Sequence, residues 1–139
     1  MDLVVGIGNP LRRDDGIGPR VARALEGSPS VSVCAVQELA PELTLRLREA
    51  RRVLFVDAEV TGTGVRLERL GSSVSGLGHG LSPRDLLGLS LEAFGEAPEA
   101  WTLCVPGVDF GYGEGLSDRA AAFLPEAIDV GTRWLSERM

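Results

Sequence analysis

The sequence predicts an α/β fold: a three-layer α/β/α sandwich with a mostly parallel, twisted five-stranded sheet that contains one antiparallel strand. One observation is that short apolar runs alternate with stretches of helical periodicity, which is the layout of a parallel sheet; the runs are residues 3–7, 31–36, 53–58 and 101–105. Another is that residues 65–70 alternate apolar and charged side chains, which is typical of a half-exposed edge strand and favours an antiparallel direction. A chain of 139 residues is long enough to bury roughly two-thirds of its unfolded surface, so we expect one domain, residues 1–139.

The first two helices follow the first and second strands. The first is expected from about Asp15 to Glu26, with Pro19 in the first turn, where a missing N–H has no intrahelical acceptor to lose. Its apolar residues share one face: Ile17, Val21 and Leu25. The second is expected from about Pro41 to Arg51 and Arg52, because arginines suit a helix C-terminus. It turns Leu43, Leu47 and Ala50 inward.

The last two helices carry clearer end signals. Ser82 followed by Pro83 predicts an N-cap and a first helical residue, and Gly95 predicts the end of that helix. Its expected buried stripe is Leu86, Leu87, Ser90, Leu91 and Phe94. The C-terminal helix starts after a cap at Ser117 and Asp118, and Pro125 is expected to kink or split it.

Composition excludes several function classes. The net charge of -6 and the pI near 4.8 argue against a nucleic acid or an anionic membrane surface as partner, since both require a basic face. No apolar run approaches the roughly 20 residues of a membrane span, so we expect no direct membrane insertion. Without a basic leader before the first strand, a cytoplasmic location is expected. Cys34 and Cys104 lie in separate apolar runs and are expected to be buried thiols.

The loop after the first strand is the most informative segment. Gly6 and Gly8 match the first two glycines of a dinucleotide fingerprint, but Leu11 stands where the third glycine belongs. Asp14 and Asp15 follow at the loop-to-helix junction, and each close charge pair would disfavour a phosphate by about 1 kcal/mol or more. The loop therefore favours a cation over a nucleotide.

Two further polar residues are expected at the same edge of the sheet. Asp57 ends the third strand and His79 lies in a glycine-rich loop before the third helix, and ligands of open parallel sheets bind outside the carboxyl ends of the strands. Taken singly, each residue has an ordinary structural explanation, such as capping a helix or bracing a loop. Together, Asp15, Asp57 and His79 form a candidate three-ligand set for Ni²⁺ or Zn²⁺ with open positions. Such an ion can polarise a peptide carbonyl or lower the pKa of its bound water.

At these residues the chain resembles the nickel-iron hydrogenase maturation endopeptidases, almost from end to end. The long opening motif is Gly6-Ile-Gly-Asn-Pro-Leu-Arg-Arg-Asp-Asp-Gly-Ile-Gly18, and two short motifs follow in order: Val56-Asp57-Ala58 and His79-Gly-Leu-Ser-Pro-Arg-Asp-Leu-Leu87. The chain departs from better-known members at Gln37-Glu-Leu-Ala-Pro-Glu42, where they often carry a glycine pair, and this resembles a subgroup of the family. The departure leaves the identity of the substrate open.

The resemblance implies an endopeptidase that removes a C-terminal extension from the hydrogenase large-subunit precursor after nickel insertion. It assigns Asp15, Asp57 and His79 as metal ligands and catalytic residues, with nickel supplied by the substrate protein, so that the isolated protein can be free of metal. Asp14 is expected to brace the loop and Asn9 to orient it through its side-chain amide, while Gly6 and Gly8 shape the loop and let a substrate tail approach.

Two other interpretations remain at this point. A non-proteolytic chaperone or checkpoint module would sense the nickel-loaded subunit with the same metal pocket and would leave the precursor uncut. A small phosphate- or nucleotide-binding domain would use the Gly6 and Gly8 loop, although Leu11 and the paired aspartates disfavour it.

Overall fold

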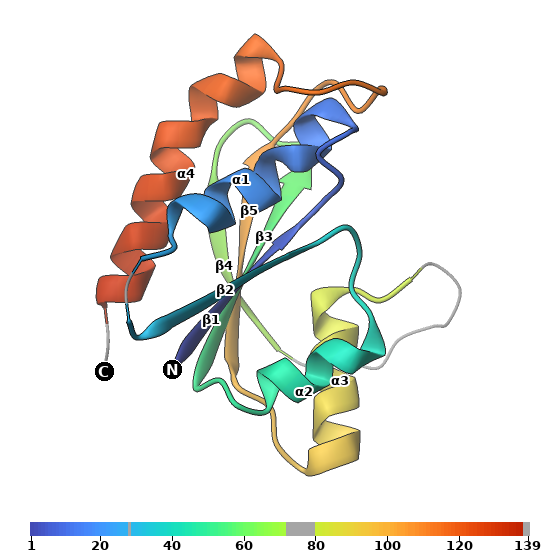
Figure 1. The fold of residues 1–139 in the computed structure, drawn as a ribbon, viewed down its shortest axis with the longest axis vertical. Coiled ribbons are helices and arrows are strands. Elements are labelled where there is room, and N and C mark those ends of the chain that lie inside the picture. The colour runs from blue at the N-terminus through green and yellow to red at the C-terminus, as the bar shows by residue number, and fades with distance from the viewer. Residues whose placement is uncertain (28, 72–79, 138–139) are drawn as a thin grey trace.

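The computed structural model describes residues 1–27, 29–71 and 80–137, and its centre is one five-stranded sheet with the strand order β2-β1-β3-β5-β4 (Figure 1). Strands β2, β1, β3 and β5 are parallel to their neighbours, and β4 pairs antiparallel with β5 at the edge. The predicted fold class is confirmed. The strands are β1 (Asp2–Ile7), β2 (Val31–Val36), β3 (Arg52–Glu59), β4 (Arg66–Leu70) and β5 (Glu99–Pro106).

Helices form the two outer layers, with α1 and α4 on one side of the sheet and α2 and α3 on the other (Figure 1). They are α1 (Ile17–Ala24), α2 (Thr44–Leu47), α3 (Pro83–Phe94) and α4 (Asp118–Ser136). Short 3-10 helices precede α1 and α2 at Arg13–Gly16 and Pro41–Leu43. None of the helices in these ranges combines the length and apolar character that crossing a membrane requires.

Two hydrophobic clusters hold the layers together. Because side chains alternate across a strand, Val4 of β1 and Leu54 of β3 enter the cluster under α1 and α4, whereas Val5 and Phe55 enter the cluster under α2 and α3. The predicted face of the first helix is confirmed, since Ile17, Val21 and Leu25 are all buried. The α-helix itself is shorter than predicted, because a 3-10 turn precedes Ile17 and Leu25 is the C-cap.

The second predicted helix is shorter than expected, because the α-helical part ends at Leu47. Arg52 does not end this helix; it is the first residue of β3 and is buried in an ion pair with Asp2. In α3, both predicted ends are confirmed by a capping box at Ser82 and a left-handed Gly95. Leu91, however, is 41% exposed, because the four-residue α2 covers only part of the apolar stripe.

Two other details bear on the expectations. Helix α4 continues through Pro125 as one element, so the proline does not split it; the proline lies on the exposed face, where the carbonyl that loses its partner can be hydrated. Cys34 and Cys104 are free thiols but only half-buried, since β2 is an edge strand and Cys104 lies near the end of β5.

Candidate functional site

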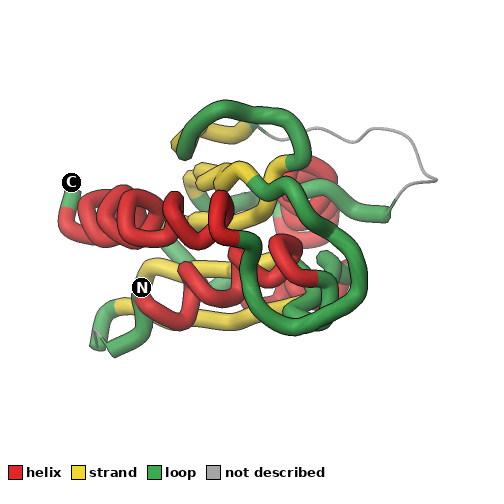
Figure 2. The backbone as a smooth tube through the Cα atoms, turned by 90° about the horizontal axis from the view of Figure 1, so that it is seen from above, coloured by secondary structure: helices red, strands yellow, loops and turns green. Residues whose placement is uncertain are grey.

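The candidate site lies at the carboxyl edge of the sheet, the end of the molecule viewed in Figure 2. The loop after β1 places Asp15 there. One carboxylate oxygen of Asp15 accepts a hydrogen bond from the backbone N–H of Asn9 (2.7 Å), and the side-chain oxygen of Asn9 accepts one from the N–H of Leu11 (2.9 Å). The loop is thus closed on itself by its own polar side chains.

The glycines of this segment allow close backbone packing. Gly8 has φ +144°, and a Cβ there would lie 1.8 Å from the carbonyl oxygen of Asp15. A Cβ on Gly6 would lie 2.7 Å from the carbonyl oxygen of Gly18, and one on Gly18 would lie 2.5 Å from that of Val56. These glycines therefore let α1 start directly against β1 and β3. Gly6 and Gly8 are themselves buried, so internal packing accounts for both.

Asp57 follows four fully buried apolar residues in β3. It does not end the strand as predicted, because β3 stays paired with β5 through Glu59. Burial raises the pKa of its carboxyl group to about 6; a hydrogen bond from the N–H of Ala58 opposes the shift, and the negative charge of Asp15 adds to it. The two aspartates predicted as ligands therefore lie close enough for their charges to interact. Two like charges with incomplete hydration are unfavourable until a cation or a proton arrives.

His79, the third predicted ligand, lies outside the described residues. Within residues 1–27, 29–71 and 80–137, no three histidine, cysteine or acidic side chains gather closely enough to hold a metal ion. The structure thus brings together Asp15 and Asp57.

Asp14 is completely buried and makes its hydrogen bonds with the loop before α4. Its carboxylate accepts hydrogen bonds from the N–H groups of Val108 (2.8 Å) and Asp109 (2.9 Å), and from both the N–H and the hydroxyl of Ser117 (each 2.7 Å). Burial alone would raise the pKa of Asp14, but these hydrogen bonds outweigh it and hold the pKa below its ordinary value. Asp14 fastens the loop before α4 to the loop that carries Asp15.

Residues 107–117 are therefore fastened to the loop that carries Asp15, a connection that sequence reasoning missed. The backbone joins the two loops as well, since the N–H of Arg13 donates to the carbonyl of Gly113 and the N–H of Gly113 donates to that of Leu11. The only signal in the sequence was Asp14 itself, a carboxylate next to the candidate ligand Asp15 for which the same loop offers no hydrogen-bond donor. The donors lie about a hundred positions later in the chain.

Comparison with solved structures places this arrangement in a known fold. The chain superposes on the hydrogenase maturating endopeptidase HybD from E. coli with a TM-score of 0.78 and 22% identity, covering 98% of this chain and 92% of that one. The chain has the fold of the hydrogenase maturation endopeptidases. The likeness extends to the NiFe hydrogenase maturation protease HycI from Thermococcus kodakarensis KOD1, with a TM-score of 0.73, 23% identity and the same coverages.

An archaeal structure agrees over its full length. The hydrogenase 2 maturation peptidase from Thaumarchaeota archaeon SCGC_AB-539-E09 matches with a TM-score of 0.72 and 19% identity over 99% of both chains. No protein-family model and no curated protein matches this sequence. At these identities the comparisons establish the shared fold.

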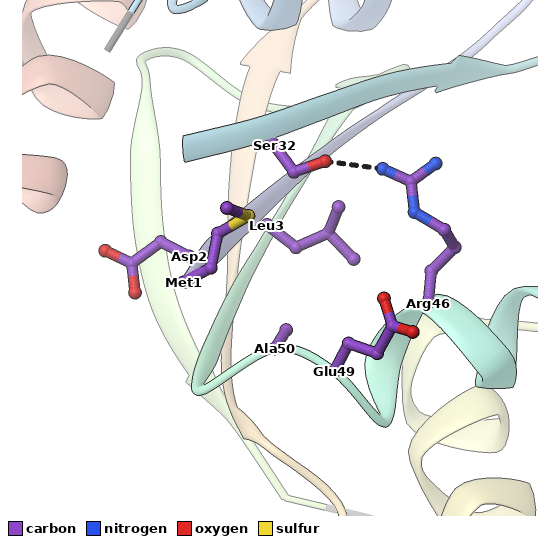
Figure 3. A pocket seen from close by; sticks show the side chains of 7 residues that line it. All are labelled: Met1, Asp2, Leu3, Ser32, Arg46, Glu49 and Ala50. Atoms are coloured by element: carbon purple, nitrogen blue, oxygen red, sulfur yellow. Dashed lines mark hydrogen bonds between the residues drawn. The ribbon is translucent and has the colours of Figure 1, made fainter. Parts of the chain in front are cut away.

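The opposite edge of the sheet carries a different hollow, shown in Figure 3. It lies at the amino ends of β1 and β2, where Arg46 reaches across to donate a hydrogen bond to the hydroxyl of Ser32 (2.6 Å). Its volume of about 40 Å³ accommodates only a few water molecules. A hollow of about 260 Å³ before β3 and β5 is larger, so volume does not separate the two edges. The carboxyl edge is the stronger candidate because it carries the carboxylates of Asp15 and Asp57.

Proposed function

We propose that this chain is a metal-dependent endopeptidase that removes the C-terminal extension of a nickel-iron hydrogenase large-subunit precursor after nickel insertion. The observation that carries the proposal is the pair Asp15 and Asp57 at the carboxyl edge of a fold shared, over nearly the whole chain, with hydrogenase maturation endopeptidases. A cytoplasmic location accompanies the proposal.

The carboxylate pair suits a divalent cation. The pKa of Asp57 is raised because the carboxyl group is partly buried and because the negative charge of Asp15 acts on it. A cation between the two carboxylates would offset both effects. One oxygen of Asp15 is committed to the N–H of Asn9, so the other is available as a ligand. With His79 as the third ligand, the donor set matches nickel or zinc and leaves positions for the substrate.

In this proposal the nickel ion belongs to the substrate protein and is the feature by which a loaded precursor is recognised. Asp15, held by Asn9, and Asp57, held by β3, bind the ion, and this fixes the precursor so that its tail crosses the carboxyl edge. When bound, the ion supplies positive charge that polarises the scissile carbonyl or lowers the pKa of the attacking water. Hydrolysis breaks the peptide C–N bond and releases the extension.

The test is co-expression of the large-subunit precursor with wild-type protein or with the variants Asp15→Ala, Asp57→Ala and His79→Ala. We expect the wild type to shorten the precursor and each variant to reduce processing at least a hundredfold, as for removal of an essential catalytic group. Mass spectrometry of the intact large subunit measures both forms. Glu126→Ala, at an exposed position of α4, is the matched control and should process normally.

The same experiment separates the two functions that the fold permits. Complete removal of the extension by all three variants would contradict the proposed site. A wild-type protein that binds the nickel-loaded precursor and leaves it full-length would instead identify a non-proteolytic checkpoint module. Circular dichroism of each purified variant verifies that it is folded.

A further inference from the structure

Exposed apolar side chains gather on the two loops beside the candidate site. Leu11 is 56% exposed, Val108 is 54% exposed and Tyr112 is 88% exposed. Leu11 belongs to the loop after β1, and the other two belong to the loop after β5. We call these three residues, together with Arg12 of the first loop and Arg20 of the adjoining helix α1, the two-loop surface. Three large apolar groups exposed on two loops that are hydrogen-bonded to each other form a candidate interaction surface.

The two-loop surface is held rigidly. Arg12 and Gly113 form a parallel bridge, the Nε of Arg12 donates to the carbonyl of Phe110 (3.1 Å), and the N–H of Asp14 donates to the carbonyl of Asp109 (2.9 Å). The buried carboxylate of Asp14 binds the same loop from beneath. Because both loops are fixed before any partner arrives, binding through them loses little conformational freedom.

The charge on this surface is opposite to that of the whole chain. The guanidinium of Arg12 lies 5.3 Å from the ring centre of Tyr112, and Arg20 lines an adjacent hollow of about 200 Å³ together with Leu11 and Leu116. Among the described residues, neither Arg12 nor Arg20 has a carboxylate partner. Arg13 is different, since it pairs with Asp109 at 3.0 Å. Glu114 is the acidic residue that lines the hollow. In a chain of net charge -6, an apolar face that carries Arg12 and Arg20 without carboxylate partners is complementary to an apolar surface that carries carboxylates.

We propose that the two-loop surface docks the folded body of the protein substrate through an apolar, acidic patch of that partner. This inference rests on the proposed function, and it assigns recognition of the substrate to residues other than those that would bind the ion. The N–H of Asp15 donates to the carbonyl of Arg12 (3.1 Å), so a partner docked on the two-loop surface contacts the loop that carries Asp15. Tyrosine and arginine are the side chains that dominate such interfaces.

The experiment measures binding and processing separately. The probe is the nickel-loaded large-subunit precursor purified from cells that lack this protein. Leu11→Ser, Tyr112→Ser, Arg12→Glu and Arg20→Glu are each compared with the wild type for dissociation constant and for the kcat and KM of processing. We expect Tyr112→Ser and Arg12→Glu to weaken binding about tenfold or more, with KM rising in parallel and kcat unchanged.

Matched controls are exposed residues outside the two-loop surface, on α2 and just before β3. Leu45→Ser removes a leucine that is 59% exposed on α2, and Arg51→Glu reverses an exposed arginine before β3; both should bind like the wild type. Raising the salt concentration should weaken wild-type binding and leave Arg12→Glu less affected.

The possible outcomes distinguish this inference from the proposed function. If the wild type processes the precursor and all four variants bind and process equally well, the docking surface is refuted and the peptidase stands. If the wild type leaves the precursor uncut but binds it, and the four variants bind more weakly, the peptidase is refuted and the docking surface stands. A wild type that neither binds nor processes the precursor overturns both.

Discussion

The two edges of the sheet differ in how their acidic side chains are partnered. At the amino edge, Asp2 of β1 lies in register with Arg52 of β3, and their side chains form a buried ion pair (2.6 Å and 3.2 Å). The Arg52 guanidinium also lies 4.0 Å from the ring centre of Trp134 and 5.9 Å from that of Trp101. At the carboxyl edge, β1 leads to Asp15 and β3 leads to Asp57, and these like charges repel each other.

The difference supports assigning the amino edge to stability and the carboxyl edge to the proposed site. A buried carboxylate is tolerated when a cation accompanies it, and the amino edge supplies its own cation from the same two strands. The carboxyl edge uses the same strands, yet no arginine of the described chain pairs with Asp15 or Asp57. Two neighbouring carboxylates without a cationic partner in the described chain are the arrangement expected of a cation-binding site.

The largest expected effect on stability comes from breaking the amino edge. Arg52→Met removes the guanidinium that pairs with the buried Asp2 and the cation from the ring of Trp134, so we expect a loss of about 3–5 kcal/mol in the free energy of unfolding. Urea unfolding at pH 7 measures it. The double variant Asp2→Leu with Arg52→Met should recover much of this loss, because both charges are then removed together.

Processing activity provides the contrast for this variant. The fraction of Arg52→Met that remains folded should process the precursor at the wild-type rate, since the substitution is at the opposite end of β3 from Asp57. A stability loss below about 1 kcal/mol, or a folded variant without activity, would contradict the assignment of the amino edge to stability.

A substitution of Asp14 tests whether its hydrogen bonds stabilise the loops at the carboxyl edge. Asp14→Ala leaves the donors of Val108, Asp109 and Ser117 without their acceptor, and we expect the free energy of unfolding to fall by about 2–3 kcal/mol. The pKa of Asp14 is lowered in the folded protein. Its stabilising contribution is therefore complete above the ordinary value of 3.8 and is lost as the pH falls through the lower folded value.

Urea unfolding at pH 7 and below pH 3 measures both parts of this prediction. The destabilisation caused by Asp14→Ala should be large at pH 7 and should shrink in acid. Asp109→Asn is the control in the same loop, because it removes only the half-exposed ion pair with Arg13 and should change stability by less than about 1 kcal/mol. Equal effects of the two substitutions at pH 7 would show that Asp14 is not the support.

Local patterns were sufficient to predict most of the fold. The alternation at residues 65–70 predicted the antiparallel edge strand β4, and Ser82 and Gly95 predicted both ends of α3, because capping and strand alternation are encoded by neighbouring residues. Arg52 was misassigned to a helix end for the complementary reason. Its stabilising partner Asp2 is fifty positions earlier in the chain, and nothing in the local sequence identifies it.

The candidate site likewise combines features that the local sequence predicts with contacts between residues far apart in the chain. The rule that ligands bind at the carboxyl ends of parallel strands identified the edge where Asp15 and Asp57 meet. It did not identify the loop 107–117, because the partners of Asp14 are set by how the chain returns through β5 and α4. The placement of His79 as a ligand stays a prediction from the sequence, since this residue lies outside the described ranges.

Of the three substitutions Arg52→Met, Asp14→Ala and Asp57→Asn, the last has the smallest expected effect on stability and gives the only gain. The folded pKa of Asp57 is about 6 against an ordinary value of 3.8, so the folded state binds this proton more tightly than the unfolded state does. The carboxyl group therefore destabilises the protein as the pH rises from about 4 to about 6, and the penalty is complete above that range. An uncharged amide avoids the penalty and keeps an oxygen that can accept the hydrogen bond from the N–H of Ala58.

We expect Asp57→Asn to be more stable than the wild type by about 2 kcal/mol at pH 8 in buffer with a chelator, and equally stable near pH 4. Urea unfolding across this range provides the measurement, and a difference that does not change with pH would contradict the origin of the effect in ionisation. Asp57→Asn should also lose processing activity. A substitution that stabilises the fold and abolishes activity is the behaviour of a residue retained for function, and no substitution of Arg52 at the amino edge should show it.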